Sequence, residues 1–162
     1  MPATSKAAPK RSSSKAITKK SNQSSNEIRI KYSDKSLGQP LLIPIFEELK
    51  KILVSYEKGT LKLLGGSGGK VELISKKPVE ICGRKRDELW FAGALVQKGY
   101  VGFYYMPVYI DASIKKLIKP ELLRCLKGKS CFYIKKFDNE IFSQIKEALE
   151  IGYKEWHQRG WI

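Results

Sequence analysis

Apolar residues recur at helical spacing in two segments of the chain. The first stripe consists of Ile45, Leu49, Ile52, Leu53 and Tyr56. The second consists of Phe142, Ile145, Leu149, Tyr153 and Trp156. Spacings of three and four residues place each set on one side of an amphipathic helix. The sequence therefore predicts a helix over residues 44–58, ended by Gly59, and a C-terminal helix capped by Asp138.

Between these helices, residues 70–109 read as consecutive strands with short turns, most clearly over residues 88–106. A two-residue turn at Lys98 and Gly99 would place Gln97 opposite Tyr100 and fix the register outward from there. Side chains that alternate along the hairpin then fall on two faces. The first face, which we assign to the helix-covered core, carries Trp90, Ala92, Ala94, Val96, Val101, Phe103, Tyr105 and Pro107.

The second face of this hairpin is the predicted functional surface. It carries Phe91, Gly93, Leu95, Tyr100, Gly102, Tyr104 and Met106. It is apolar too, and the pairing of Gly93 with Tyr104 and of Gly102 with Leu95 would leave shallow gaps. A sheet that is apolar on both faces is usually covered twice. We therefore expect a protein partner, a small ligand or a second copy in a homodimer to cover this face.

The remaining segments predict ordinary packing elements. A short helix begins near Asp111 or Ser113, another starts at Pro120 and stops at Gly128, and residues 130–134 form a further strand. The glycine-rich residues 65–69 lack the spacing of a phosphate-binding loop and are followed by a strand-like segment. We expect them to connect two strands.

The excess of positive charge is unevenly distributed. The chain of 162 residues has a formal net charge of +15, and residues 1–31 hold eight basic residues against Glu27, a net +7, which leaves +8 for residues 32–162. The first residues are rich in Ser and Lys and poor in apolar groups, so we predict a disordered basic tail over residues 1–36 and one domain over residues 37–162. No apolar stretch resembles a signal peptide or is long enough to span a bilayer, which favours a cytoplasmic protein with no membrane partner.

Candidate catalytic chemistry is sparse. His157 is the one histidine, and Cys82, Cys125 and Cys131 match neither the spacing of zinc sites nor that of CxxC redox motifs. Both Cys125 and Cys131 have apolar neighbours and read as small buried hydrophobic residues. We therefore expect no enzyme activity and no cofactor.

Four segments carry a resemblance to a known family. Residues 89–94 (LWFAGA), 99–107 (GYVGFYYMP), 126–132 (LKGKSCF) and 160–162 (GWI) resemble the YdhG-like family of small intracellular domains. The resemblance covers residues 40–162 and implies an α+β, two-layer sandwich like that of frataxin, with helices packed on one face of an antiparallel sheet. It also implies an iron-chaperone role for part of the family, while most members have no assigned activity.

Two alternatives to a sheet-face binding module follow. An iron role would use carboxylates of the first helix, Glu47 and Glu48, but Lys50 and Lys51 nearly neutralise that ridge. A nucleic-acid role would use lysines of the tail and of the strand near residue 131 as phosphate ligands, with Phe91, Tyr100 and Tyr104 stacking on bases. These lysines are Lys19, Lys20, Lys127, Lys129, Lys135 and Lys136.

Overall fold

A computed structural model describes residues 31–162, and the compact unit within it is Tyr32–Ile162. Residues 1–30 of the predicted tail, including Lys19 and Lys20, lie outside the described residues. Residues 31–36 of the predicted tail are described. Within residues 31–36, Ser36 donates to the carboxylate of Asp34 at 2.8 Å, and the Lys35 ammonium donates to Gln97 at 2.6 Å. The domain therefore begins some residues before the expected position 37.

The chain is an α+β domain. Its helices are the short η1 (Pro40–Leu42), α1 (Ile43–Val54), α2 (Pro107–Ile110), α3 (Ala112–Lys115), α4 (Pro120–Arg124) and α5 (Asn139–Gln158). Its strands are β1 (Leu61–Ser67), β2 (Lys70–Ser75), β3 (Val79–Ile81), β4 (Arg84–Arg86), β5 (Leu89–Gln97), β6 (Tyr100–Tyr105), β7 (Leu126–Lys127) and β8 (Cys131–Ile134).

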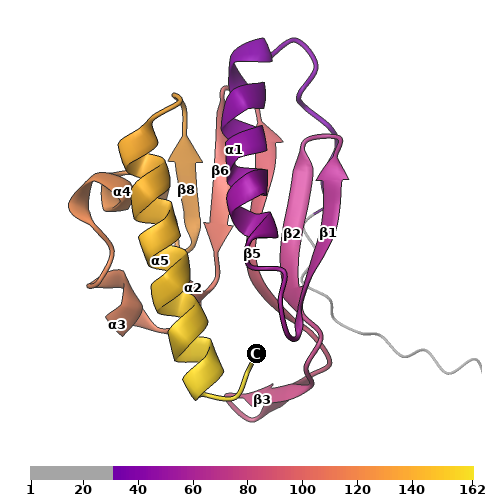
Figure 1. Cartoon of the computed structure of the whole chain (residues 1–162), viewed down its shortest axis with the longest axis vertical. Helices are drawn as coiled ribbons and strands as arrows, with labels where there is room; N and C mark the ends of the chain where they lie inside the picture. Colours follow the sequence, from indigo (N-terminus) through magenta and orange to yellow (C-terminus); the bar gives the residue numbers. More distant parts are fainter. Residues whose placement is uncertain (1–30) are drawn as a thin grey trace, which may run out of the picture. The chain divides into compact units, whose positions relative to one another are not determined.

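Six of these strands form one sheet in the order β1-β2-β5-β6-β8-β7, and β3 pairs with β4 in a separate hairpin. All the pairings are antiparallel. Helices α1 and α5 lie on the same side of the large sheet, and α3 and α4 lie toward its β8 edge (Figure 1). The core fills the space between these helices and the sheet, with Ile45, Leu49, Phe103, Phe132 and Leu149 fully buried there.

The two amphipathic stripes form helices as predicted. Asp138 caps α5 by accepting from the backbone N–H groups of Glu140 and Ile141 at 2.9 and 3.3 Å. Helix α1 ends at Val54, earlier than the predicted residue 58, because Ser55 and Tyr56 continue in turns and Tyr56 packs against α5. Pro120 begins α4 as predicted, but the helix ends at Arg124 and not near Gly128, because Leu126 and Lys127 pair with β8 as strand β7. Residues 131–134 form β8, as predicted. Only part of the glycine-rich segment connects two strands: Gly65, Gly66 and Ser67 lie within β1, where the register shifts, and Gly68 and Gly69 make the turn to β2 with positive φ.

The register of the central hairpin is the predicted one. Gln97 pairs with Tyr100, Leu95 with Gly102, and Gly93 with Tyr104. Toward the start of β5, however, the alternation of side chains breaks. Leu73 of β2 pairs with Ala92 while the next residue, Ile74, pairs with Trp90, so Phe91 is an extra residue in β5. This β-bulge exchanges the faces on which Trp90 and Phe91 lie.

Candidate ligand-binding face of the sheet

No helix of the described residues lies over the face of the sheet opposite α1 and α5 (Figure 1). Residues that pair directly across antiparallel strands share a face, so the register identifies the side chains there. None of them belongs to the core cluster. We call this surface the open face and define its centre as Trp90, Gly93, Leu95, Tyr100, Gly102, Tyr104, Cys131 and Tyr133.

Four aromatic rings dominate the open face. Trp90 of β5 and Tyr104 of β6 lie with their centroids 5.4 Å apart and their planes 29° from parallel. Tyr100 of β6 and Tyr133 of β8 stack face to face, with centroids 3.8 Å apart and an angle of 11°. All four side chains are half-buried, so each retains accessible surface. The two aromatic pairs therefore span strands β5, β6 and β8, and β6 contributes one ring to each pair.

Two glycines seat the first of these pairs. A Cβ atom added to Gly93 would lie 2.9 Å from Cζ2 of Trp90, and one added to Gly102 would lie 2.9 Å from Cε2 of Tyr104. Both glycines have ordinary strand conformations, so the missing side chain is what matters here. The predicted shallow gaps over Gly93 and Gly102 are therefore filled by the rings of Trp90 and Tyr104.

Two predicted members of this face do not belong to it. Phe91 is fully buried on the helix side, where its ring meets those of Tyr105 and Trp156 at 6.2 and 5.0 Å. The bulge in β5 turns it there, and Trp90, assigned by alternation to the core, takes its place on the open face. Met106 follows the last residue of β6, precedes α2 and packs against the core cluster.

Gly93, Leu95, Tyr100, Gly102 and Tyr104 do lie on the open face, and the structure brings them together. Sequence reasoning missed Tyr133, although its alternation with the core residues Phe132 and Ile134 in the predicted strand was the available signal. It also missed Trp90, for which counting alternate residues gives no signal.

Two tyrosines of the open face, Tyr100 and Tyr104, have raised pKa values. Burial, followed by the adjacent Cys131, raises the pKa of Tyr104 to about 12. Burial and a hydrogen bond with Tyr133 raise the pKa of Tyr100. Glu72 is a buried carboxylate near this face, and the Lys70 ammonium pairs with it at 3.1 Å. The face therefore presents no unpaired negative charge at its centre.

Lysines border this face at the β7 and β8 edge. Lys127 of β7 pairs with Cys131, which in turn pairs with Tyr104, so these three residues form one row across the sheet. Lys135 and Lys136 follow β8 and are exposed. Lys129 lies in the turn between β7 and β8, with its ammonium 5.6 Å from the ring of Tyr109. The structure thus gathers the four predicted phosphate ligands of the domain at one edge of the sheet.

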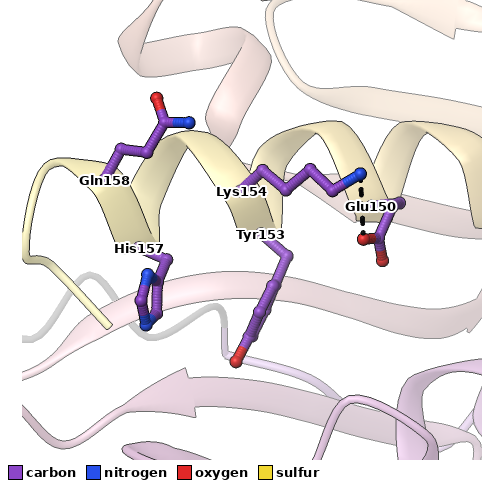
Figure 2. A pocket seen from close by; sticks show the side chains of 5 residues that line it. All are labelled: Glu150, Tyr153, Lys154, His157 and Gln158. Carbon is purple, nitrogen blue, oxygen red and sulfur yellow. Dashed lines mark ion pairs between the residues drawn. The ribbon is translucent and has the colours of Figure 1, made fainter.

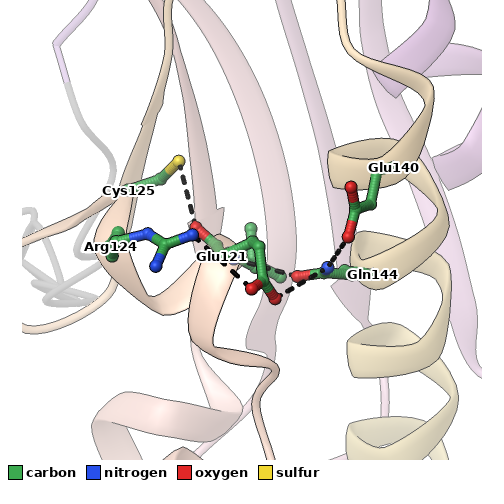
Figure 3. A network of polar contacts seen from close by, with 6 residues as sticks. Glu121, Arg124, Cys125, Glu140 and Gln144 are labelled. Atoms are coloured by element: carbon green, nitrogen blue, oxygen red, sulfur yellow. Dashed lines mark hydrogen bonds and ion pairs between the residues drawn. The ribbon is translucent and has the colours of Figure 1, made fainter.

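A buried glutamine holds this edge in place (Figure 3). Gln144 of α5 accepts from the backbone N–H of Leu122 in α4 at 2.9 Å. Its amide nitrogen donates to Glu121 and Glu140, each at 3.2 Å. Because α4 leads directly into β7, these bonds fix the position of the strand that carries Lys127.

The thiols of Cys125 and Cys131 are poor candidates for nucleophiles. Burial raises the pKa of both Cys125 and Cys131, and a reactive cysteine needs a lowered pKa because the thiolate is the nucleophile. Cys82 is exposed at the tip of the β3–β4 hairpin. All three cysteines are free.

A second concave region lies on α5 (Figure 2). Glu150, Tyr153, Lys154, His157 and Gln158 line a hollow of about 270 Å³. The Lys154 ammonium pairs with Glu150 at 3.4 Å, and the His157 ring stacks on Tyr153 at 6.2 Å. His157 has no carboxylate partner among the described residues. This hollow therefore offers no acid–base pair.

The two carboxylates proposed for iron are already paired. Glu47 contacts Lys50 at 3.3 Å, while Glu48 lies 4.0 Å from Lys51 and 3.9 Å from Lys146. Within residues 31–162, no group of three or more His, Cys, Asp or Glu side chains could hold a metal ion. No helix in this part of the chain is long and apolar enough to cross a membrane.

Comparison with known proteins adds no relative to this description. No family model, no curated protein and no solved structure matches the chain.

Proposed function

We propose that this chain is a non-enzymatic binding module that takes nucleic acid on the open face of its sheet. The observation that carries the proposal is the combination of four accessible aromatic rings with a lysine-rich edge on the face that no described helix covers. Aromatic rings stack on bases of any sequence, and lysines neutralise phosphates. Membership in the YdhG-like family, implied by resemblance alone, stays a prediction.

The charge of the face favours nucleic acid over a protein partner with an apolar docking surface. Burial raises the pKa of Tyr100 and of Tyr104, and Glu72 is paired with Lys70, so the described residues place no unpaired carboxylate at its centre. Aromatic residues are also enriched in protein interfaces, whereas lysine is depleted there, so the lysines at the edge of the face are what favours nucleic acid.

Binding of fluorescein-labelled oligonucleotides to the full chain, followed by fluorescence anisotropy, tests this proposal. The panel contains single-stranded and duplex forms of RNA and DNA, and binding of any form counts. Replacing an aromatic ring by leucine keeps apolar cover and removes stacking, which is worth about 1–3 kcal/mol per base. We expect Trp90→Leu and Tyr104→Leu each to weaken binding about 5- to 150-fold.

Tyr153→Leu is the matched control, because Tyr153 is a half-buried aromatic residue on α5, in the opposite layer. It should bind as the unchanged protein does. If both face variants bind as tightly as the control, binding occurs elsewhere, for example through the basic residues 1–31, and the proposal is wrong. Failure of every oligonucleotide to bind at low salt also overturns it and leaves a protein partner as the occupant.

A paired substitution separates stability from binding. Phe91→Leu removes a ring from the helix side, so it should lower the free energy of unfolding and leave the affinity of the folded fraction unchanged. Trp90→Leu should lower the affinity and change the free energy of unfolding less than Phe91→Leu does. Urea unfolding followed by circular dichroism measures the first quantity for both variants.

A further inference from the structure

The positive charge of the domain is concentrated in one segment. Residues 115–136 hold eight basic residues and one acid, Glu121, a net +7 of the +8 carried by residues 32–162. This segment runs from the end of α3 through α4 to β7 and β8, at one edge of the sheet (Figure 1). Part of this charge, on Lys127, Lys129, Lys135 and Lys136, lies at the β7 and β8 edge, beside the open face.

Two lysines of this segment stand level with the two aromatic pairs. Lys127 is in the row of Cys131 and Tyr104. Val101 pairs with Ile134, so Lys135, one position further, stands level with Tyr100. Neither lysine has a carboxylate partner among the described residues. Each aromatic pair thus has an available ammonium group beside it, at the outer edge of the sheet.

The spacing of these rows fits a short stretch of nucleic acid. Tyr100 and Tyr104 are four residues apart on β6, which corresponds to about 13 Å at ~3.3 Å per residue. A stacked strand places one phosphate every ~3.4 Å, so this length holds at most about four nucleotides. A backbone that runs along β8 between Lys127 and Lys135 could therefore direct its bases inward to both aromatic pairs.

The aromatic rings also select the form of the ligand. The Trp90 indole and the Tyr104 ring pack against Gly93 and Gly102, so they are held close to the sheet and cannot extend into a groove. Bases of a duplex are stacked and paired inside the helix, whereas unpaired bases can turn out onto such rings.

We propose that the open face binds single-stranded nucleic acid, with the phosphates along the edge between Lys127 and Lys135 and the bases on Trp90–Tyr104 and Tyr100–Tyr133. This inference rests on the proposed function and adds the class of ligand and its path. The lysines are positioning contacts that give no base specificity, since phosphates are the same in every sequence.

The test compares the full chain with two double variants of equal charge. Lys127→Gln/Lys135→Gln removes the proposed contacts. Lys51→Gln/Lys154→Gln is the control, because both lysines are exposed on α1 and α5 in the opposite layer. The affinity for a 12-nucleotide single strand is measured as a function of salt concentration, and the affinity for the duplex of the same sequence is measured in parallel.

We expect the single strand to bind at least about tenfold more tightly than the duplex, because only unpaired bases gain the stacking energy. Each lost phosphate contact lowers the slope of log K against log salt by about 0.7 for a single strand. The slope should therefore fall by about 1.4 in the edge variant and stay unchanged in the control.

Equal affinities for the single strand and the duplex would overturn the ligand class. Equal changes of slope in the two double variants would overturn the path. In either case the proposed function stands if Trp90→Leu and Tyr104→Leu still lose affinity. If those two variants bind as the unchanged protein does, the open face is not the site and the proposed function itself fails.

Discussion

Gly152→Ala should destabilise the domain, although alanine favours a helix. Gly152 lies in the interior of α5 and is buried against the end of β6 and the start of α2. An added Cβ would overlap with the hydroxyl of Tyr105 and lie 2.8 Å from Cγ of Pro107 and 2.9 Å from Cζ of Tyr105. The substitution therefore sets a local helix preference against the packing of the helix on the sheet.

The structure gives the size of the effect. Alanine in place of glycine in a helix interior gains about 1 kcal/mol. Overpacking a close contact costs about 1–3 kcal/mol. The displaced Tyr105 hydroxyl also loses its hydrogen bond to the carbonyl of Ala148, and a buried hydroxyl without a partner costs about 1–3 kcal/mol. Taking the middle of each range, we expect a net loss of about 3 kcal/mol.

Urea unfolding, followed by far-ultraviolet circular dichroism, measures this loss. Ser143→Ala, on the exposed side of the same helix, controls for helix preference and should change stability by less than about 0.5 kcal/mol. In a double-mutant cycle, Tyr105→Phe removes the overlapping hydroxyl and should recover at least about 1 kcal/mol of the loss. A Gly152→Ala variant as stable as the unchanged protein, or a cycle without coupling, would refute this account of the α5 contact.

Three further predictions concern polar contacts. Gln144→Leu keeps a similar volume but leaves the backbone N–H of Leu122 without its acceptor, so urea unfolding should show a loss of about 1–3 kcal/mol; an unchanged midpoint would contradict this. Hydrogen bonds from the Ser113 side chain, then its backbone N–H and Arg159, lower the pKa of Asp111 to about 2. Because this pKa is lowered on folding, the ionised carboxylate stabilises the domain above the unfolded pKa near 4, and this stabilisation is lost as the pH falls toward 2. Between about pH 4 and pH 2, the melting temperature of Asp111→Asn should therefore fall less steeply with pH than that of the unchanged protein. Equal slopes of melting temperature against pH would disprove this role of Asp111. Glu57 accepts from the N–H of Leu63 on the edge strand β1 at 3.0 Å, and an unpaired N–H on an edge strand can pair with another chain. Glu57→Ala should therefore self-associate more than Glu57→Gln, measured as molar mass by light scattering. Equal molar masses of the two variants would count against an edge-blocking role of Glu57.

Elements specified by local signals could be predicted from the sequence. The turn at Lys98 and Gly99 set the register of β5 and β6, Asp138 marked the start of α5, and Pro120 marked the start of α4. Each of these depends on the conformational preference or hydrogen bonding of one or two residues. Gly152 is a further local signal: a glycine inside a helical stripe usually has a packing reason, and here Tyr105 and Pro107 approach it closely.

The start of β5 could not be predicted in the same way. Counting alternate residues assumes that every residue of a strand has one partner, and Phe91 is an extra residue opposite the step from Leu73 to Ile74. What holds Phe91 on the helix side is its contact with Trp156, a residue far away in the sequence. Packing over such a distance leaves no mark in the local pattern, so the two neighbouring aromatic residues were assigned to the wrong faces.

The bulge bears on the proposed function because it decides which aromatic ring the open face presents. Glycine in a strand interior weakens the strand and often marks a place where another group approaches closely, and Gly93 and Gly102 each make room for an aromatic ring of the face itself. A face that only had to exclude water would be more stable with β-branched residues at these positions. Under the proposed function, the two glycines make room for the rings that stack on bases, and the +7 of charge on residues 115–136 supplies the phosphate contacts.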